Sequence, residues 1–173
     1  IYTSIAEGFR SGGFNNTSSI SQGGNPSFKP ENLLSYELGI KAALLDKRLN
    51  TEVALFFSDY TDYISQSFNP DCGCSSFGNT NKAEVKGIEW NFQWFASDRL
   101  SLGFAGNVTD GEFTEAGPAP STLIEGDPLD FVPEYSYSIT SDYRFDLSQS
   151  VSGYFRMDFN RQGSNNLVNR TVG

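Results

Sequence analysis

Alternation of apolar and polar residues is the feature that most restricts how this chain of 173 residues can fold. In the run 35–44, Tyr36 and Leu38 fall on one side of an extended backbone, and Glu37 and Lys41 fall on the other. Successive side chains of a strand point to opposite faces, so a period of two predicts a β-strand with one apolar and one polar face. The pattern recurs along the chain and gives about seven strands and no clear helix.

Short and long connections alternate between these strands. Tight turns are expected at 45–48, 96–99 and 146–150, and long Gly-, Ser-, Asn- or Pro-rich loops at 10–32, 65–79 and 112–133. The first strand is predicted from Ile1 to Phe9 and the third from Leu49 to about Ile64. Strands long enough to cross a bilayer, with short turns at one end and long loops at the other, are typical of an outer-membrane β-barrel. The expected fold is therefore all-β: a transmembrane antiparallel up-and-down barrel segment with short periplasmic turns and long extracellular loops.

Composition narrows the possible partners. The 12 Lys and Arg residues against 21 Asp and Glu give a net charge of -9, which argues against nucleic acid because phosphate binding needs a basic surface. Aromatic residues make up 14% of the chain, a share that suits the aromatic girdles of a membrane barrel. An aromatic-rich soluble β-domain remains an alternative at this point.

Histidine is absent and there are two cysteines, Cys72 and Cys74. Without histidine the chain lacks the commonest general base and metal ligand, and no catalytic pair or zinc ligand set stands out. We therefore expect no enzyme activity, no metal site and no cofactor. The spacing Cys72-Gly73-Cys74 favours a disulfide in an exterior loop, with free thiols as the alternative.

Several motifs together resemble one family. They are YTSIAEGFRSGGFN at 2–15, FKPE at 28–31, SYELGIK at 35–41 and NKAEVKGIE at 81–89. In order and spacing they resemble the C-terminal barrel portion of TonB-dependent outer-membrane receptors, over essentially the whole chain. The resemblance implies a location in the outer membrane of a Gram-negative bacterium. It also implies active import of a scarce, bulky nutrient such as a ferric siderophore.

The same resemblance implies how the rest of the protein is organised. Residues 1–173 would be part of one barrel of roughly 22 strands, with the plug domain and the C-terminal strands outside this chain. The implied partners are outer-membrane lipid, a small-molecule cargo such as an iron chelate, and the TonB energy-transducing complex acting through the plug.

Two groups of residues are candidates for function. The polar strand faces are expected to line the lumen and contact the plug or water: Glu37, Lys41, Glu52, Glu89, Asn91 and Gln93. Loops and strand tops are expected to contact the cargo through Arg10, Phe14, Tyr60, Tyr63 and Phe68. Aromatic rings there can stack on a flat ligand, and Arg10 can pair with an anionic chelate. An alternative places Tyr60 and Tyr63 in the interfacial girdle.

Two other functions remain open at this stage. One is a passive outer-membrane porin, which is also a barrel but has no plug. The other is a soluble β-sandwich module for binding or adhesion, in which Trp90, Phe92 and Trp94 would point into an enclosed core.

Overall fold

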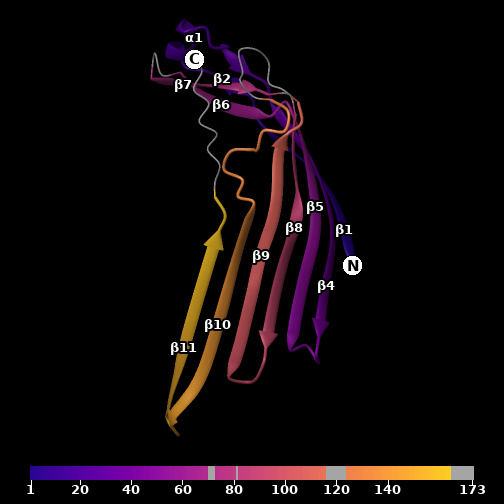
Figure 1. Cartoon of the computed structure of the whole chain (residues 1–173), viewed down its shortest axis with the longest axis vertical. Helices are drawn as coiled ribbons and strands as arrows, with labels where there is room; N and C mark the ends of the chain where they lie inside the picture. The colour runs from indigo at the N-terminus through magenta and orange to yellow at the C-terminus, as the bar shows by residue number, and fades with distance from the viewer. Residues whose placement is uncertain (70–72, 81, 116–123, 165–173) are drawn as a thin grey trace.

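Seven long antiparallel strands form one sheet in the computed structural model, which describes residues 1–69, 73–80, 82–115 and 124–164 (Figure 1). Their order in the sheet is β1 (Tyr2–Arg10), β4 (Glu31–Leu44), β5 (Leu49–Thr61), β8 (Lys82–Phe95), β9 (Leu100–Phe113), β10 (Tyr135–Ser148) and β11 (Val151–Gln162). Consecutive long strands are thus neighbours in space, which is the up-and-down arrangement that the alternation predicts. β1 and β11 form the two edges of this sheet.

The pairing register separates apolar from polar side chains across the sheet. Leu38 lies opposite Leu55, which in turn lies opposite Ile88 and then Val108. Because side chains alternate along each strand, in-register pairing carries the apolar face of one strand directly into the next. The result is a sheet with one apolar face and one polar face.

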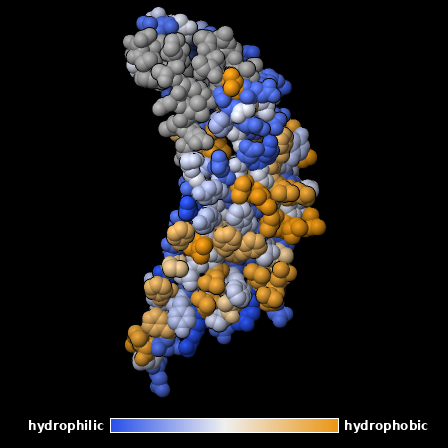
Figure 2. All heavy atoms as spheres, viewed as in Figure 1, coloured by the Kyte–Doolittle hydropathy of each residue, from blue (hydrophilic) through white to orange (hydrophobic). Residues whose placement is uncertain are grey.

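The apolar face has the height of a membrane. On β4 the apolar side chains run without interruption from Leu34 to Leu44, which is ten residue steps. At about 3.3 Å per residue and a strand tilt of about 40°, ten steps rise about 25 Å, the height of the apolar band on membrane barrels. On the same face, Lys86 and Asp110 pair with each other above this band, where charged side chains begin. Figure 2 shows hydrophobic residues gathered over the middle and lower part of the sheet, with hydrophilic residues at its upper end.

Among the residues that the structure describes, no second layer covers the apolar face of the sheet. Leu38, Ile40 and Trp94 are 50%, 51% and 44% exposed. Such exposure is costly in water but expected of side chains that face lipid. The alternative of a soluble β-sandwich is therefore wrong, because Trp94 and its neighbours on the apolar face are not covered by a second layer.

The three tight turns lie together at one end of the sheet (Figure 1). In the turn after β4, Leu45, Asp46 and Lys47 all have positive φ, and the Arg48 amide donates to the Leu45 carbonyl over 3.0 Å. This left-handed backbone reverses the chain within four residues, as the immediate return of the alternation predicts. The long connections lie at the opposite end of the sheet. The expected separation of short turns and long loops is therefore confirmed.

The long connections contain more regular structure than the sequence predicts. The region expected as a loop at 10–32 holds the short strands β2 (Gly13–Phe14) and β3 (Ser27–Phe28) and the helix α1 (Thr17–Ser21). The expected loop at 65–79 is largely a second hairpin, β6 (Ile64–Asn69) with β7 (Cys74–Asn79). Both regions were wrongly expected to be loops. The helix was missed because α1 is a single turn capped by the Asn16 side chain, which is too short to give a periodic pattern.

The third predicted strand also ends earlier than expected. β5 stops at Thr61, and Asp62 adopts a φ of 54°, which breaks the extended backbone before Ile64 starts β6. No helix in the described part of the chain is long and apolar enough to cross a membrane.

Candidate functional site

The polar face of the sheet carries all six residues predicted to line the lumen. Lys41 lies opposite Glu52, and their charged atoms are 2.5 Å apart. The Tyr2 hydroxyl donates to Glu37, and the Lys41 ammonium lies 5.1 Å from the centre of the Tyr2 ring. The other members, Glu89, Asn91 and Gln93, continue the same face on β8. Their contact with a plug stays a prediction.

This face is hollowed. An open concavity of about 920 Å³ extends from β5 to β11 and is lined by Glu52, Glu89, Asn91, Asn107 and Asn160 among others. Aromatic and small side chains, among them Phe56, Trp90 and Tyr137, line the hollow together with these carboxylates and amides, so its surface is mixed in polarity.

Arg10, predicted from the sequence to contact cargo, takes part in a hydrogen-bonded group that links the ends of β1 and β4 to the start of β6. Its guanidinium donates to the Glu31 carboxylate and to the Ile64 carbonyl, both over 2.6 Å. The Ile64 amide donates to the same Glu31 oxygen, also over 2.6 Å. The positive charge of Arg10 is therefore matched by Glu31, which is buried, and the pair fixes the start of β6. We call Arg10, Glu31 and Ile64 the loop clamp.

Tyr60 and Tyr63 belong to a small apolar cluster at the upper end of the polar face. The Tyr63 ring meets Tyr60 and Phe113 edge to face, with ring centres 5.7 and 5.6 Å apart. Phe113 and Leu129 are each 2% exposed. Burial raises the pKa of both tyrosines. A place in the interfacial girdle is wrong for this pair, since Tyr60 follows the polar side of β5 and Tyr63 packs on the same cluster.

The two long loops at this end are tied to each other by asparagine side chains. Asn15 accepts from the Phe77 amide over 2.8 Å and donates to the Phe77 carbonyl over 2.7 Å. Asn79 makes the reciprocal pair with the Lys29 amide and carbonyl, over 2.7 and 3.0 Å. Each side-chain amide makes the pair of hydrogen bonds that the backbone of a neighbouring strand would make. The connection between β1 and β4 is therefore joined to the β6–β7 hairpin. Sequence reasoning missed these contacts because an isolated asparagine in a polar loop gives no signal of its partner.

The remaining predicted residues lie on this joined body. Phe14, in β2, is 88% exposed, and its contact with cargo stays a prediction. Phe68 pairs through its backbone with Ser75 in the β6–β7 hairpin. Cys74 begins β7 and is not free, but Cys72 lies outside the described residues, so the bond between them stays a prediction. In the described ranges, no three His, Cys, Asp or Glu side chains are grouped to hold a metal ion.

Comparison with known protein families identifies the barrel. The family model described as "TonB dependent receptor-like, beta-barrel" matches residues 1–173. The chain belongs to this family. The TonB-dependent receptor barrel is an outer-membrane structure of Gram-negative bacteria, which agrees with the apolar band and with the arrangement of turns and loops.

Similar proteins agree with this family. The chain is 30% identical to the pesticin receptor of Yersinia enterocolitica over 135 residues, which is 78% of this chain and 19% of that protein. It is 22% identical over 156 residues to the probable TonB-dependent siderophore receptor PiuA of Acinetobacter baumannii, covering 83% of this chain and 20% of that protein. The chain thus spans about a fifth of the length of these relatives.

Solved structures show the same fold. The ferric yersiniabactin uptake receptor FyuA of Yersinia pestis superposes with a TM-score of 0.70 at 22% identity, over 93% of this chain and 23% of that one. The ferric preacinetobactin receptor BauA of Acinetobacter baumannii gives a TM-score of 0.65 at 17% identity, over 92% of this chain and 23% of that one. This TonB-dependent receptor barrel therefore keeps the strand arrangement of known receptors while differing from them at most positions.

Proposed function

We propose that this chain forms part of the wall and outer mouth of a receptor that imports a ferric siderophore across the outer membrane, energised through TonB. The observation that carries the proposal is the match of the family model over the whole chain. The names of two relatives, PiuA and FyuA, point to siderophores as the cargo class. Import of this kind is transport, not catalysis.

The polar face carries charges that a plug seated against it would have to match. Glu52 is paired with Lys41, and Glu37 accepts from Tyr2, whereas Glu89 takes part in no ion pair among the residues that the structure describes. Three carboxylates against one lysine leave this wall negative. A plug that seats here is therefore expected to present lysine or arginine, since buried charges need partners.

The end of the sheet that carries the long connections, which we call the mouth, is consistent with cargo capture outside the membrane. Phe14 is exposed on the joined loops, and the loop clamp holds Arg10 beside the Tyr63 ring, with its guanidinium carbon 5.9 Å from the ring centre. We propose that Phe14, Phe68 and this Arg10–Tyr63 pair are the nearest parts of the chain to an arriving chelate. Because Glu31 already neutralises Arg10, attraction of an anionic cargo by charge alone is expected to be weak here.

Growth under iron limitation tests the proposal. The full-length receptor is expressed in a Gram-negative host that lacks its own siderophore receptors, with and without a working TonB. Iron(III) complexes of catecholate, phenolate and hydroxamate siderophores are then supplied one at a time. Growth on at least one chelate that disappears without TonB is expected. Equal growth in the two hosts would mean passive entry and would favour the porin.

A second arm examines the plug. The receptor lacking its plug is compared with the intact protein for binding of the chelate that supports growth. Loss of binding is expected, because the complete site should need surfaces of both plug and mouth. Equal binding by the barrel alone would contradict the plugged-receptor mechanism.

A further inference from the structure

The connection between β9 and β10 returns along β9 before β10 begins. The Phe113 amide donates to the Asp127 carbonyl and the Leu129 amide to the Gly111 carbonyl, each over 2.9 Å. Further down, the Thr109 amide donates to the Glu134 carbonyl over 2.8 Å. Between these two hydrogen-bonded positions the returning chain has four residues, 130–133, whereas β9 has only Asp110. This bulge is tethered to β9 on both sides.

Phe131 lies within the bulge in an unfavourable backbone conformation. Its φ is 64°, in the left-handed region that bulky side chains rarely adopt. The other non-glycine residues with positive φ in the described ranges are three members of the tight turn after β4 and Asp62, and aspartate tolerates this region. Phe131 is thus the one aromatic residue among them.

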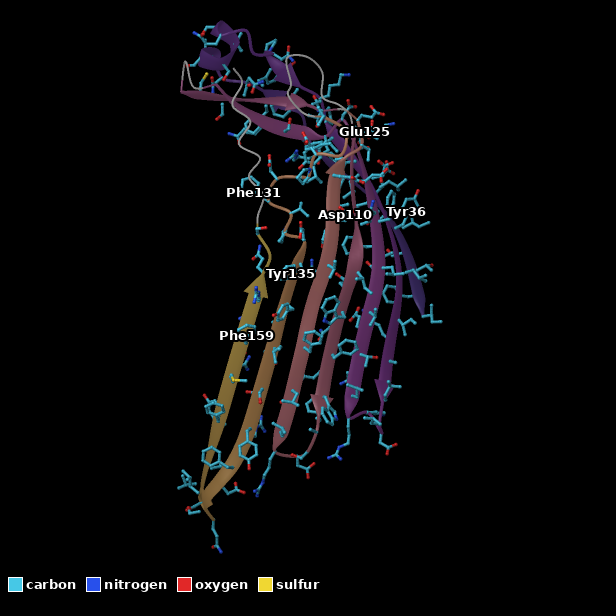
Figure 3. The ribbon with its side chains drawn as sticks, in the orientation of Figure 1. Tyr36, Asp110, Glu125, Phe131, Tyr135 and Phe159 are labelled. Carbon is cyan, nitrogen blue, oxygen red and sulfur yellow. The ribbon has the colours of Figure 1, made fainter. Side chains whose placement is uncertain are left out.

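The strain at Phe131 is not balanced by burial of its ring among the described residues of this chain. The residue is 69% exposed, whereas Leu129 is 2% exposed and the Val132 side chain covers Gly111. The residues beside it hold the bulge on the sheet, while Phe131 itself points away from the packing. In Figure 3 Phe131 stands off the sheet, on the side of β9 away from β8. A strained residue held in place by its surroundings is an indication of function.

The bulge lies on the polar face at the mouth. Leu129 packs in the cluster of Phe113 and Ala83, with Val132 and Tyr63 against it. Phe131 directly precedes Val132 and is therefore held at the mouth beside this cluster.

We propose that Phe131 is a cargo-contacting residue whose ring stacks on the aromatic chelating group of a catecholate or phenolate siderophore. This inference rests on the proposed function. An exposed ring without a charged partner selects for flat π-systems, since offset stacking adds to simple burial of area. A hydroxamate chelate offers no such ring and gains little from Phe131.

The test uses the full-length receptor in detergent and quenching of its intrinsic fluorescence by iron(III) chelates. The probes are iron(III) enterobactin, iron(III) yersiniabactin and ferrioxamine B, which carry catecholate, phenolate and hydroxamate groups. Phe131→Asn removes the ring and fits the left-handed backbone, so the bulge should stay folded. Its Kd for an aromatic chelate should rise about tenfold. Phe131→Trp should stay within about threefold of the wild type.

Glu125→Gln provides a control in the same connection, because Glu125 is exposed and the bulge is tethered by backbone hydrogen bonds of other residues. Its Kd should equal that of the wild type. Limited proteolysis should show the connection equally protected in the wild type and in Phe131→Asn, which excludes a merely structural role. An unchanged Kd in Phe131→Asn would overturn the inference, as would wild-type binding of ferrioxamine B alone. A wild type that binds none of the chelates and fails in the growth assay would instead contradict the proposed function.

Discussion

The loop clamp allows the contribution of a half-buried ion pair to the stability of this barrel to be measured. Replacing Glu31 with alanine removes the acceptor of two hydrogen bonds, one from Arg10 and one from the Ile64 amide. Arg10 is half exposed and can turn to water, but Ile64 is 7% exposed and its amide is left without an acceptor. Opening of the β6–β7 hairpin should therefore become easier.

The magnitude follows from these contacts. A hydrogen bond to a charged group contributes about 1.5–3 kcal/mol, and a buried amide without a partner costs a similar amount. Because the solvated Arg10 recovers part of its share, we expect a loss of about 2–3 kcal/mol in the local opening free energy. At 1.4 kcal/mol for each factor of ten, amide exchange at Ile64 should be roughly 30 to 150 times faster.

Hydrogen–deuterium exchange on the full-length receptor measures this directly. The matched control is Asp146→Ala, because the Arg99–Asp146 pair has the same 2.6 Å separation but is more than half exposed on both sides. An exposed pair contributes at most about 1 kcal/mol, so exchange near it should rise by about fivefold or less. Glu31→Gln keeps an acceptor without the charge and should fall between the two. Equal effects of Glu31→Ala and Asp146→Ala would refute the reasoning.

Three further predictions follow from the two faces and the small cluster. Ile40→Lys places a charge in the lipid-facing band and should cost about 2–4 kcal/mol in a refolding titration, whereas Asn91→Lys on the polar face should cost far less. Gly106→Val should lower the folded fraction seen by heat-dependent gel mobility, because the Trp90 ring and the Ser136 carbonyl occupy the space that the valine side chain would need. Gly78→Val should leave the folded fraction unchanged, because the space around Gly78 is open. Burial raises the pKa of Tyr63 above its usual 10.0, so the cluster keeps its full stability below pH 10 and loses it as pH rises through the raised pKa. Absorbance at 295 nm should show a late tyrosinate step that Tyr63→Phe lacks, and an unchanged titration curve would contradict this assignment.

Patterns among residues close together in the sequence were sufficient to predict the strands and hairpins of the barrel wall. Alternation assigned the faces of β4 and β5, and the four-residue return after Leu44 predicted their hairpin, because both depend on neighbours in sequence. The faces of Glu37, Lys41 and Glu52 followed from the same period of two. The structure adds that Lys41 and Glu52 pair directly, which needs the register between strands.

The mouth could not be predicted in the same way. Arg10 looked available for an anionic cargo because its partner Glu31 lies 21 residues away and the third member of the clamp, Ile64, lies 54 away. Tyr60 and Tyr63 fitted cargo contact and an interfacial girdle equally well, since their surroundings come from Phe113 and Leu129 across two later connections.

The sequence by itself determined the alternation, the turns, the membrane-facing band and the family, because each is set by residues close together in the chain. Only the tertiary structure decided which loops join, which charges are matched and where the backbone is strained. Asn15 and Phe77, or Leu129 and Ala83, meet only after the strands have aligned in register. Phe131 shows the difference most clearly: its residue type is ordinary in a loop, and only the tethers on either side of it hold its exposed ring in a left-handed backbone.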